Sequence, residues 1–260
     1  MLVVISPAKR LDWDRGADLE TTQPRFDREA ARLAGHARQL NIKELRALMD
    51  ISEDLARLNR DRFRDFAAEP DPRATRPAVL AFAGDTYTGL DAPSLDPEGL
   101  AWAQDHLRIL SGLYGALRPL DAIQPYRLEM GSALRSRRGG TLYDFWRKDL
   151  ARSLKEDARA LGTDTLVNCA SQEYFGAVDE KSLGLRVISP VFLERKDGKE
   201  KIVSFFAKKA RGAMARFIID QRVTDAEGVL DFDYGGYRHE AAMSDSDRPV
   251  FVRETPAEAG

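Results

Sequence analysis

The sequence has few of the residues that build disulfides and metal centres. Its 260 residues include one cysteine, Cys169, and three histidines far apart in the chain, His36, His106 and His239. One cysteine forms no internal disulfide, and these residues do not make the ligand pattern of a structural zinc or iron–sulfur site. We therefore expect no metal. Because Cys169 lies in an apolar run, we expect a buried thiol rather than a nucleophile.

Long hydrophobic runs are also absent. The longest, such as Leu2–Ile5, are far shorter than the roughly 18 residues that a membrane span needs. The opening residues, MLVVISPAKRLDW, have no basic leader before the apolar run, and we expect no signal peptide. Together with the single cysteine, these features predict a cytoplasmic protein. Hydrophobic residues make up 43% of the chain and charged residues 32%, which is typical of a globular protein.

The chain has almost no overall charge, but its charges are unevenly distributed. The formal net charge is −2, yet six arginines between Arg108 and Arg138 accompany only two acidic residues. Between Arg195 and Arg216, eight basic residues accompany two acidic ones, and after Thr224 nine acidic residues accompany three arginines. Such an asymmetry can give a nearly neutral protein a basic surface, although ordinary solvation of exposed faces explains it as well. We expect the two basic segments to share one face.

Apolar runs alternate with helical periodicities, which predicts a mixed α/β fold in a single domain spanning residues 1–260. Buried strands are expected at LVVIS, AVLAFAG, DTLVNCAS and RPVFVRE, and two more flank the Asp197–Gly198 turn. Helices are expected at about 26–40, 52–66, 97–110, 141–161 and 206–222, the second capped by Ser52. No internal repeat is visible.

The segment LSGLYGALRPLDAIQPYRLEMG, residues 110–131, concentrates backbone-shaping residues. A helical pattern precedes it, and a short helix can restart at Leu120 or Asp121. Helix, glycine turn and helix are the plan of a helix-hairpin-helix element, expected at about 97–127. Its glycines would let the backbone approach a phosphate, and its arginines would add charge. The glycines are three residues apart rather than two, and a tight turn between packed helices explains the pattern equally well. The candidate DNA-binding residues here are Arg108, Gly112, Gly115, Arg118 and Arg127.

A second candidate DNA-binding surface lies on the expected helix SFFAKKARGAMARFIID. At 100° per residue, its apolar side chains gather on one side. Gly212 interrupts the basic side and would let it lie close to a phosphodiester backbone. A solvated helix face is the alternative. The basic residues are Lys208, Lys209, Arg211 and Arg216.

Polar side chains follow three of the expected strands. Lys9 comes after the first and Asp85 after the second, while Asn168, Ser171 and Glu173 surround the end of the third. Ligands of α/β sheets bind at the carboxyl ends of strands, so we expect these residues to line one cleft as candidate catalytic residues. Lys9 beside Glu173 would suit phosphate binding or proton transfer. The chain has neither a P-loop nor a GxGxxG motif.

Seven motifs occur in order along the chain: SPAK, GDTYTGL, HLRILSGLYGALRPLDAIQPYRLEMG, LYDFW, NCASQEYF, SPVFL and SFFAKKARGAMARFII. Together they resemble the YaaA peroxide-stress family over nearly the whole length. The resemblance implies a cytoplasmic bacterial protein that limits damage from hydrogen peroxide by lowering free intracellular iron. It further implies binding to DNA, including irregular duplexes, through a positively charged cleft and a helix-hairpin-helix element. No cofactor and no settled reaction come with the family.

Two hypotheses follow. The first is a DNA-binding protection protein without catalysis. The second is an enzyme, hydrolase or glycosylase-like, that acts on nucleic acid or a nucleotide with the polar residues at the strand ends. The two hypotheses are distinguished by whether the polar residues at the strand ends meet in one pocket beside the basic surface, as an enzyme requires, or lie apart.

Overall fold

Strand β1 (Leu2–Ile5) lies at the centre of a five-stranded sheet in the computed structural model, which describes residues 1–254. Its parallel neighbours are β5 (Leu107–Ser111) and β8 (Thr165–Cys169). The edges are β6 (Gly115–Leu117), antiparallel to β5, and β9 (Arg186–Ile188), parallel to β8. Every residue of β1 is buried, as expected for the central strand of a covered parallel sheet. The strands predicted at LVVIS and DTLVNCAS are therefore confirmed.

A second sheet contains the C-terminal strands, and two short ladders complete the β-structure. In the second sheet β10 and β13 are parallel, and the outer pairs are antiparallel. The hairpin at Asp197–Gly198 and the strand in RPVFVRE are confirmed. The strands are β10 (Val191–Lys196), β11 (Lys199–Lys201), β12 (Arg238–His239) and β13 (Val250–Glu254), with the ladders β2 (Arg10–Leu11) to β4 (Phe82–Ala83) and β3 (Arg76–Pro77) to β7 (Ala122–Ile123).

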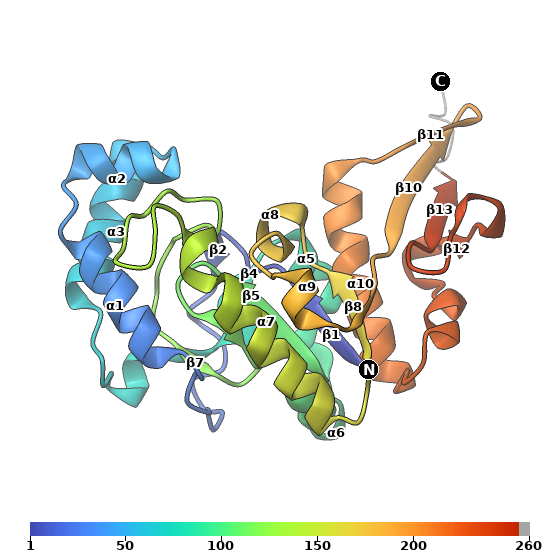
Figure 1. Cartoon of the computed structure of the whole chain (residues 1–260), viewed down its shortest axis with the longest axis horizontal. Helices are drawn as coiled ribbons and strands as arrows, with labels where there is room; N and C mark the ends of the chain where they lie inside the picture. The colour runs from blue at the N-terminus through green and yellow to red at the C-terminus, as the bar shows by residue number, and fades with distance from the viewer. Residues whose placement is uncertain (255–260) are drawn as a thin grey trace.

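Three helices pack together at one end of the molecule, away from the second sheet (Figure 1). They are α1 (Asp27–Arg38), α2 (Ile42–Met49) and α3 (Glu53–Asp65). The others are α4 (Ala78–Ala81), α5 (Asp85–Leu90), α6 (Pro97–His106), α7 (Leu142–Ala160), α8 (Gln172–Phe175), α9 (Glu180–Leu183) and α10 (Ser204–Gln221). No helix within residues 1–254 is long and apolar enough to cross a membrane.

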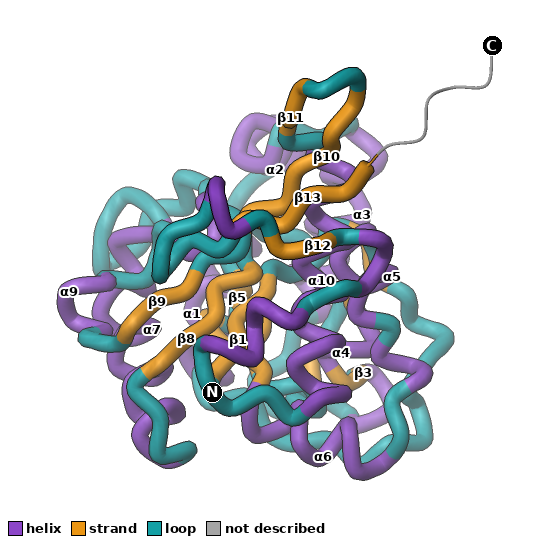
Figure 2. Tube along the Cα trace, turned by 90° about the vertical axis from the view of Figure 1, so that its right-hand side faces the viewer, coloured by secondary structure: helices purple, strands orange, loops and turns teal. Residues whose placement is uncertain are grey.

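The long helices follow the sequence signals closely. Ser52 accepts a hydrogen bond from the backbone N–H of Leu55 at the start of α3, and Thr141 forms a capping box with Asp144 at the start of α7. Helix α10 contacts β1 and β8 of the first sheet and β10 of the second. It therefore links the two sheets, and Figures 1 and 2 show it beside both of them.

The predicted helix-hairpin-helix is not confirmed. Helix α6 ends at His106, and the next five residues form β5 in the first sheet. The residues SGLYG turn β5 into β6, and residues 118–127 contain β7 and no helix. The apolar residues after His106 fit a helical period and a buried strand equally well, and pairing with β1 decides between them.

The two glycines of this hairpin are needed for packing in the core. A Cβ on Gly112 would lie 2.4 Å from the carbonyl oxygen of Leu128. Gly115 has a φ of 71°, and a Cβ there would lie 2.8 Å from the ring of Trp146. Both glycines are buried, so they shape the hairpin for the protein's own interior.

The run AVLAFAG was predicted to be a buried strand, and this prediction is wrong for most of its length. Its first four residues form the helical turn α4, and only Phe82 and Ala83 form a strand, β4. A short apolar run does not distinguish a buried strand from a buried helical turn, and alanine favours the helix.

Candidate functional site

A cleft of about 430 Å³ lies where the chain leaves β1, β4 and β8. We call it the strand-end cleft. Helix α10 closes it from the side of the second sheet. Its charged lining residues are Lys9 and Arg10 after β1, Asp85 after β4, Glu173 after β8, and Lys208 and Arg211 of α10. Four of the five candidate catalytic residues, Lys9, Asp85, Ser171 and Glu173, therefore line one cavity.

Two serines join the strand ends beneath the cleft. The backbone N–H of Ser171 donates to the Oγ of Ser6 at 2.8 Å, and the two hydroxyl oxygens lie 3.3 Å apart. The hydroxyl of Tyr87 on α5 donates to the carbonyl oxygen of Ser6 at 3.2 Å. These contacts tie β1, β8 and α5 together and fix the base of the cleft.

Lys9 forms an ion pair on the rim of the cleft, but not with the expected partner. Its Nζ lies 3.2 Å from Oε1 of Glu129, which also pairs with Arg127 at 3.0 Å. Glu173 instead accepts a hydrogen bond from the backbone N–H of Gly131 at 3.1 Å. The Lys9 side chain is 67% exposed, whereas that of Glu129 is 12% exposed. Glu129 thus holds two cations at this edge of the cleft.

Asn168, the fifth candidate catalytic residue, does not line the cleft. Its Oδ1 accepts from the backbone N–H of Ala170 at 3.0 Å, and its Nδ2 donates to the hydroxyl of Ser189 at 3.4 Å. These bonds shape the loop that leaves β8. Asn168 therefore stabilises the loop that carries Ser171 and Glu173 and does not itself face the cleft.

Helix α10 directs its basic residues to different places. Lys208 lines the strand-end cleft, whereas its exposed neighbour Lys209 lines a separate hollow with Phe206 and Tyr234. Arg216 is 18% exposed; it pairs with Asp220 at 2.8 Å and donates to backbone carbonyls near the end of α5. Of the four basic residues predicted on this helix, Lys208 and Arg211 belong to the cleft.

Arg211 is the least exposed cation of the cleft. Its Nε is buried without an acceptor, and the side chain has no hydrogen bond or ion pair within the described part of the chain. Burial lowers the pKa of its guanidinium below the usual value. Behind it, burial raises the pKa of the Cys169 thiol to about 12, even though Arg211 acts in the opposite direction. Cys169 is completely buried in β8, so the predicted buried thiol is confirmed.

Tyr174 of the cleft has two further buried tyrosines, Tyr87 and Tyr126, as neighbours. Burial raises the pKa of Tyr87, Tyr126 and Tyr174 well above that of a free phenol. Their hydroxyls therefore stay protonated at neutral pH and act as hydrogen-bond donors or acceptors rather than as bases. Tyr174 lines the cleft itself and adds an aromatic surface to its wall.

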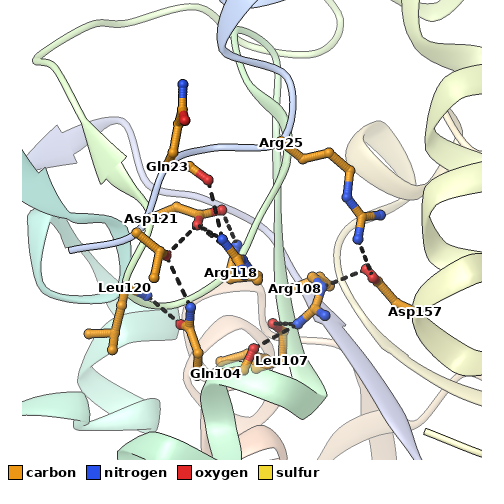
Figure 3. A network of polar contacts seen from close by, with 10 residues as sticks. Gln23, Arg25, Gln104, Leu107, Arg108, Arg118, Leu120, Asp121 and Asp157 are labelled. Atoms are coloured by element: carbon orange, nitrogen blue, oxygen red, sulfur yellow. Dashed lines mark hydrogen bonds and ion pairs between the residues drawn. The ribbon is translucent and has the colours of Figure 1, made fainter. Parts of the chain in front are cut away.

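Of the three arginines predicted on the hairpin, Arg108 lies in the interior and Arg118 in an ion pair, as Figure 3 shows, and Arg127 pairs with Glu129. Arg108 is 6% exposed, and its Nε donates to Asp157 at 2.7 Å, so a nucleic-acid phosphate has no access to it. Arg118 donates to the buried carboxylate of Asp121 at 3.0 Å. Arg108 is therefore lost from the expected basic face and Arg118 is neutralised by Asp121, whereas Arg135 and Arg137 of the same segment are exposed. Arg127 reaches the edge of the cleft through Glu129.

Sequence reasoning missed Arg10, which lines the cleft, and Glu129, which pairs with Lys9 at its rim. Arg10 follows Lys9 directly in SPAKR, and the same strand-end argument that selected Lys9 applies to it. Glu129 lies in a loop far along the chain, and nothing in its local sequence indicates a partner at Lys9. Within residues 1–254, no group of three or more His, Cys, Asp or Glu residues is placed to hold a metal ion.

Comparisons with known proteins match almost the whole chain. The family model described as peroxide stress protein YaaA matches residues 1–243. A UPF0246 protein of Roseobacter denitrificans is 64% identical over 259 residues, covering 99% of this chain and 100% of the relative. Another from Ruegeria pomeroyi is 64% identical over 253 residues, covering 97% and 98%. A third, from Phenylobacterium zucineum, is 51% identical over 257 residues, covering 98% and 96%.

Proposed function

We propose that this chain, which belongs to the peroxide stress protein YaaA family, binds DNA without sequence preference at the strand-end cleft. The supporting observation is the convergence of four cations on one cavity: Lys9 and Arg10 from the end of β1, and Lys208 and Arg211 from α10. Contacts from such side chains to phosphates hold a nucleic acid in place and carry no sequence information.

The size of the cleft suits an irregular duplex. A volume of about 430 Å³ does not accommodate a double helix, so the duplex lies across the mouth of the cleft. Lys208 and Lys209 are exposed neighbours at the start of α10 and contact its phosphates there. A nucleotide that is unpaired or turned out of the stack can enter the cavity, which costs least at a mismatch or bulge.

Binding is tested by fluorescence anisotropy with a plain duplex and the same duplex carrying a bulge. About four engaged cations give a log–log salt slope between about −3 and −4, because each neutralised phosphate contributes about −0.9. Replacing Lys208 with alanine should weaken binding and reduce the slope by about one phosphate. Arg73→Ala is the matched control, since Arg73 is a fully exposed arginine outside the cleft. A flat salt response, or equal losses in both variants, would remove the support for this site.

In the cell, we propose that the protein acts in the cytoplasm to limit iron-driven oxidative damage and to lower free iron. The supporting observation is its membership of a peroxide-stress family together with the basic cleft. Chelatable iron and survival are measured after hydrogen peroxide treatment in bacteria that lack their own copy and carry either this protein or its K208A/K209A variant. Restored survival and lower iron with the parent protein are expected. If neither changes, the cellular part of the proposal fails.

A second candidate function is an enzyme that acts on a nucleotide or on nucleic acid. The observation that favours it is the presence of two carboxylates, Asp85 and Glu173, in the same cleft as the cations. Carboxylates repel a phosphate backbone, but they can activate water or accept a proton. Product analysis by mass spectrometry, with D85N and E173Q as controls, separates this function from simple binding.

A further inference from the structure

The guanidinium of Arg211 has no anionic partner among residues 1–254, although most of the side chain is removed from water. Its Nε is buried and has no hydrogen-bond acceptor among residues 1–254. Neither Asp85 nor Glu173 forms an ion pair with the guanidinium. A buried cation without a counter-charge is costly, and a planar guanidinium binds phosphate through paired N–H groups. Because Arg211 lines the cleft, the anion that matches it approaches from the cavity.

Asp85 places a second unpaired group in the same cavity. Its carboxylate forms no hydrogen bond or ion pair with any residue that the structure describes, and its residue is only partly exposed. The Asp85 carboxylate accepts hydrogen bonds and repels anions. Arg211 and Lys208 donate hydrogen bonds and attract anions. A simple anion such as inorganic phosphate therefore uses only part of this lining. A ligand with a phosphate at one end and hydroxyl or amino donors at the other can bind the cations and the Asp85 carboxylate at the same time.

The remaining walls of the cleft suit a compact ligand with an apolar face. Pro7, Ala8 and Ala83 add apolar side chains to the lining, and Tyr174 adds an aromatic ring. The volume of about 430 Å³ lies in the usual range for small-molecule sites, which is about 300 to 1,000 Å³. A nucleoside monophosphate combines the required parts in this size: one phosphate, sugar hydroxyls or base amino groups, and a flat base.

We infer that the strand-end cleft is a binding site for a nucleoside monophosphate group. Arg211 and Lys208 hold the phosphate, and Asp85 accepts a hydrogen bond from a sugar hydroxyl or a base amino group. This inference shares one premise with the proposed function, namely that the strand-end cleft binds the ligand. It does not require that the protein binds a DNA duplex. A free nucleotide and the phosphorylated end of a DNA strand share the same chemistry, and the experiment below separates the two sources.

The test is isothermal titration of the whole protein with each of the common ribo- and deoxyribonucleoside 5′-monophosphates, with inorganic phosphate and with the matching nucleosides. At least one monophosphate should bind about 10- to 100-fold more tightly than phosphate or its nucleoside, since both ends of the ligand contribute a bond to a charged group. Equal affinity for phosphate and every nucleotide, or no binding at millimolar concentration, would overturn the inference for free nucleotides.

Short single strands of DNA test the second possible source of the nucleotide group, which is the phosphorylated end of a strand. The same tetranucleotide is titrated with and without a 5′-phosphate. Preference for the phosphorylated strand together with no binding of free monophosphates assigns the site to strand ends. If neither the strand end nor any free nucleotide binds in preference to inorganic phosphate, the inference is wrong.

Two variants test the named residues in opposite ways. R211M should reduce nucleotide affinity about 10- to 100-fold, since it removes hydrogen bonds to a charged phosphate. D85N should weaken nucleotide binding but strengthen binding of inorganic phosphate, because it removes a like charge beside the anion. Thermal melting confirms that both variants fold. If D85N strengthens nucleotide binding as well, Asp85 is not a ligand contact and the inference falls.

K209A separates this inference from the proposed DNA binding. Lys209 is adjacent to Lys208 but lines a different hollow, so its loss should leave nucleotide affinity unchanged and weaken duplex binding. If monophosphates bind and duplexes do not, the DNA proposal fails and the nucleotide site stands. If duplexes bind and neither monophosphates nor strand ends do, the reverse holds.

Discussion

Arg108 on β5 donates from Nε to Oδ2 of Asp157 on α7 at 2.7 Å, and each side chain is only 7% exposed. The same guanidinium donates to the carbonyl oxygens of Gln104 and Leu107, and Asp157 accepts a further hydrogen bond from Arg25 (Figure 3). This buried pair joins the first sheet to its long covering helix. Its charge is neutralised within the protein, so it does not contribute to a binding surface.

Replacing Arg108 with alanine should destabilise the protein by about 1.5–3 kcal/mol, because Asp157 loses one of its two arginine partners and keeps Arg25. Arg152→Ala is the control on α7: this arginine is 67% exposed, and loss of its pair with Asp149 should cost about 0–1 kcal/mol. Urea unfolding measures both. An R108A protein that keeps its stability but loses DNA binding would show that Arg108 faces a ligand instead of the core.

The sequence predicts the local structure of this protein better than its long-range contacts. The N-caps at Ser52 and Thr141 identify the starts of α3 and α7, because capping depends on residues three positions away. The strand β5 is missed, because its helix-like spacing is overridden by pairing with β1, about 100 residues earlier. The number of arginines in residues 108–138 wrongly predicts that Arg108 is on the surface, because its partner Asp157 is 49 residues away in the sequence.

The candidate site divides in the same way. That polar residues after parallel strands meet in a cleft follows from the geometry of the sheet, and it holds for Lys9 after β1 and Glu173 after β8. Asp85 reaches the same cleft from β4, which lies outside that sheet. The pairing of Lys9 with Glu129 depends on the path of an irregular loop, which no local pattern specifies. Among residues 1–254 the Nε of Arg211 has no hydrogen-bond partner, and only the folded structure reveals this.

Gly115→Ala should destabilise the protein by about 2–4 kcal/mol. About 1 kcal/mol or more comes from the φ of 71°, and the rest comes from forcing a Cβ against Trp146. Gly162→Ala isolates the first contribution, because Gly162 has a φ of 64° with nothing within 4 Å of a Cβ. Its cost should be about 1 kcal/mol. Equal costs for the two variants in urea unfolding would show that the hairpin relaxes away from Trp146.

His106 should make the protein less stable in mild acid. Burial lowers the pKa of its imidazole, which stacks on Trp102 at 3.8 Å between ring centroids. The unfolded chain then takes up a proton near pH 6.5 while the native state resists it. The stability from neutral His106 is therefore present above pH 6.5 and is lost as the pH falls below that value toward the native pKa.

His106→Phe keeps an aromatic ring on Trp102 and removes the titrating group. Thermal melts of the parent and variant are compared from pH 7.5 to pH 5. The parent should lose more stability than the variant over this range, by at most about 1.4 kcal/mol per pH unit. Parallel curves for the two proteins would show that His106 is protonated as easily in the native state as in the unfolded chain.

Cys169 should not react with peroxide in the folded protein, even though the family is named for peroxide stress. The thiolate is the reactive form of cysteine, and its formation needs a low pKa and access to solvent. Burial in β8 raises the pKa of Cys169 to about 12, and the side chain is inaccessible. At pH 8 the thiolate is therefore rare, and the reagent does not reach it.

Labelling with iodoacetamide at pH 8 tests this expectation, first in buffer and then in 6 M guanidinium chloride. The native protein should label at least about 100-fold more slowly than the unfolded chain, and hydrogen peroxide should yield sulfenic acid only after unfolding. Cys169→Ser provides the blank. Cys169→Ala should keep any protection from peroxide that the parent protein confers on cells. If it abolishes that protection while the protein stays folded, the thiol takes part in the chemistry, and a local opening of β8 beside Arg211 must expose it.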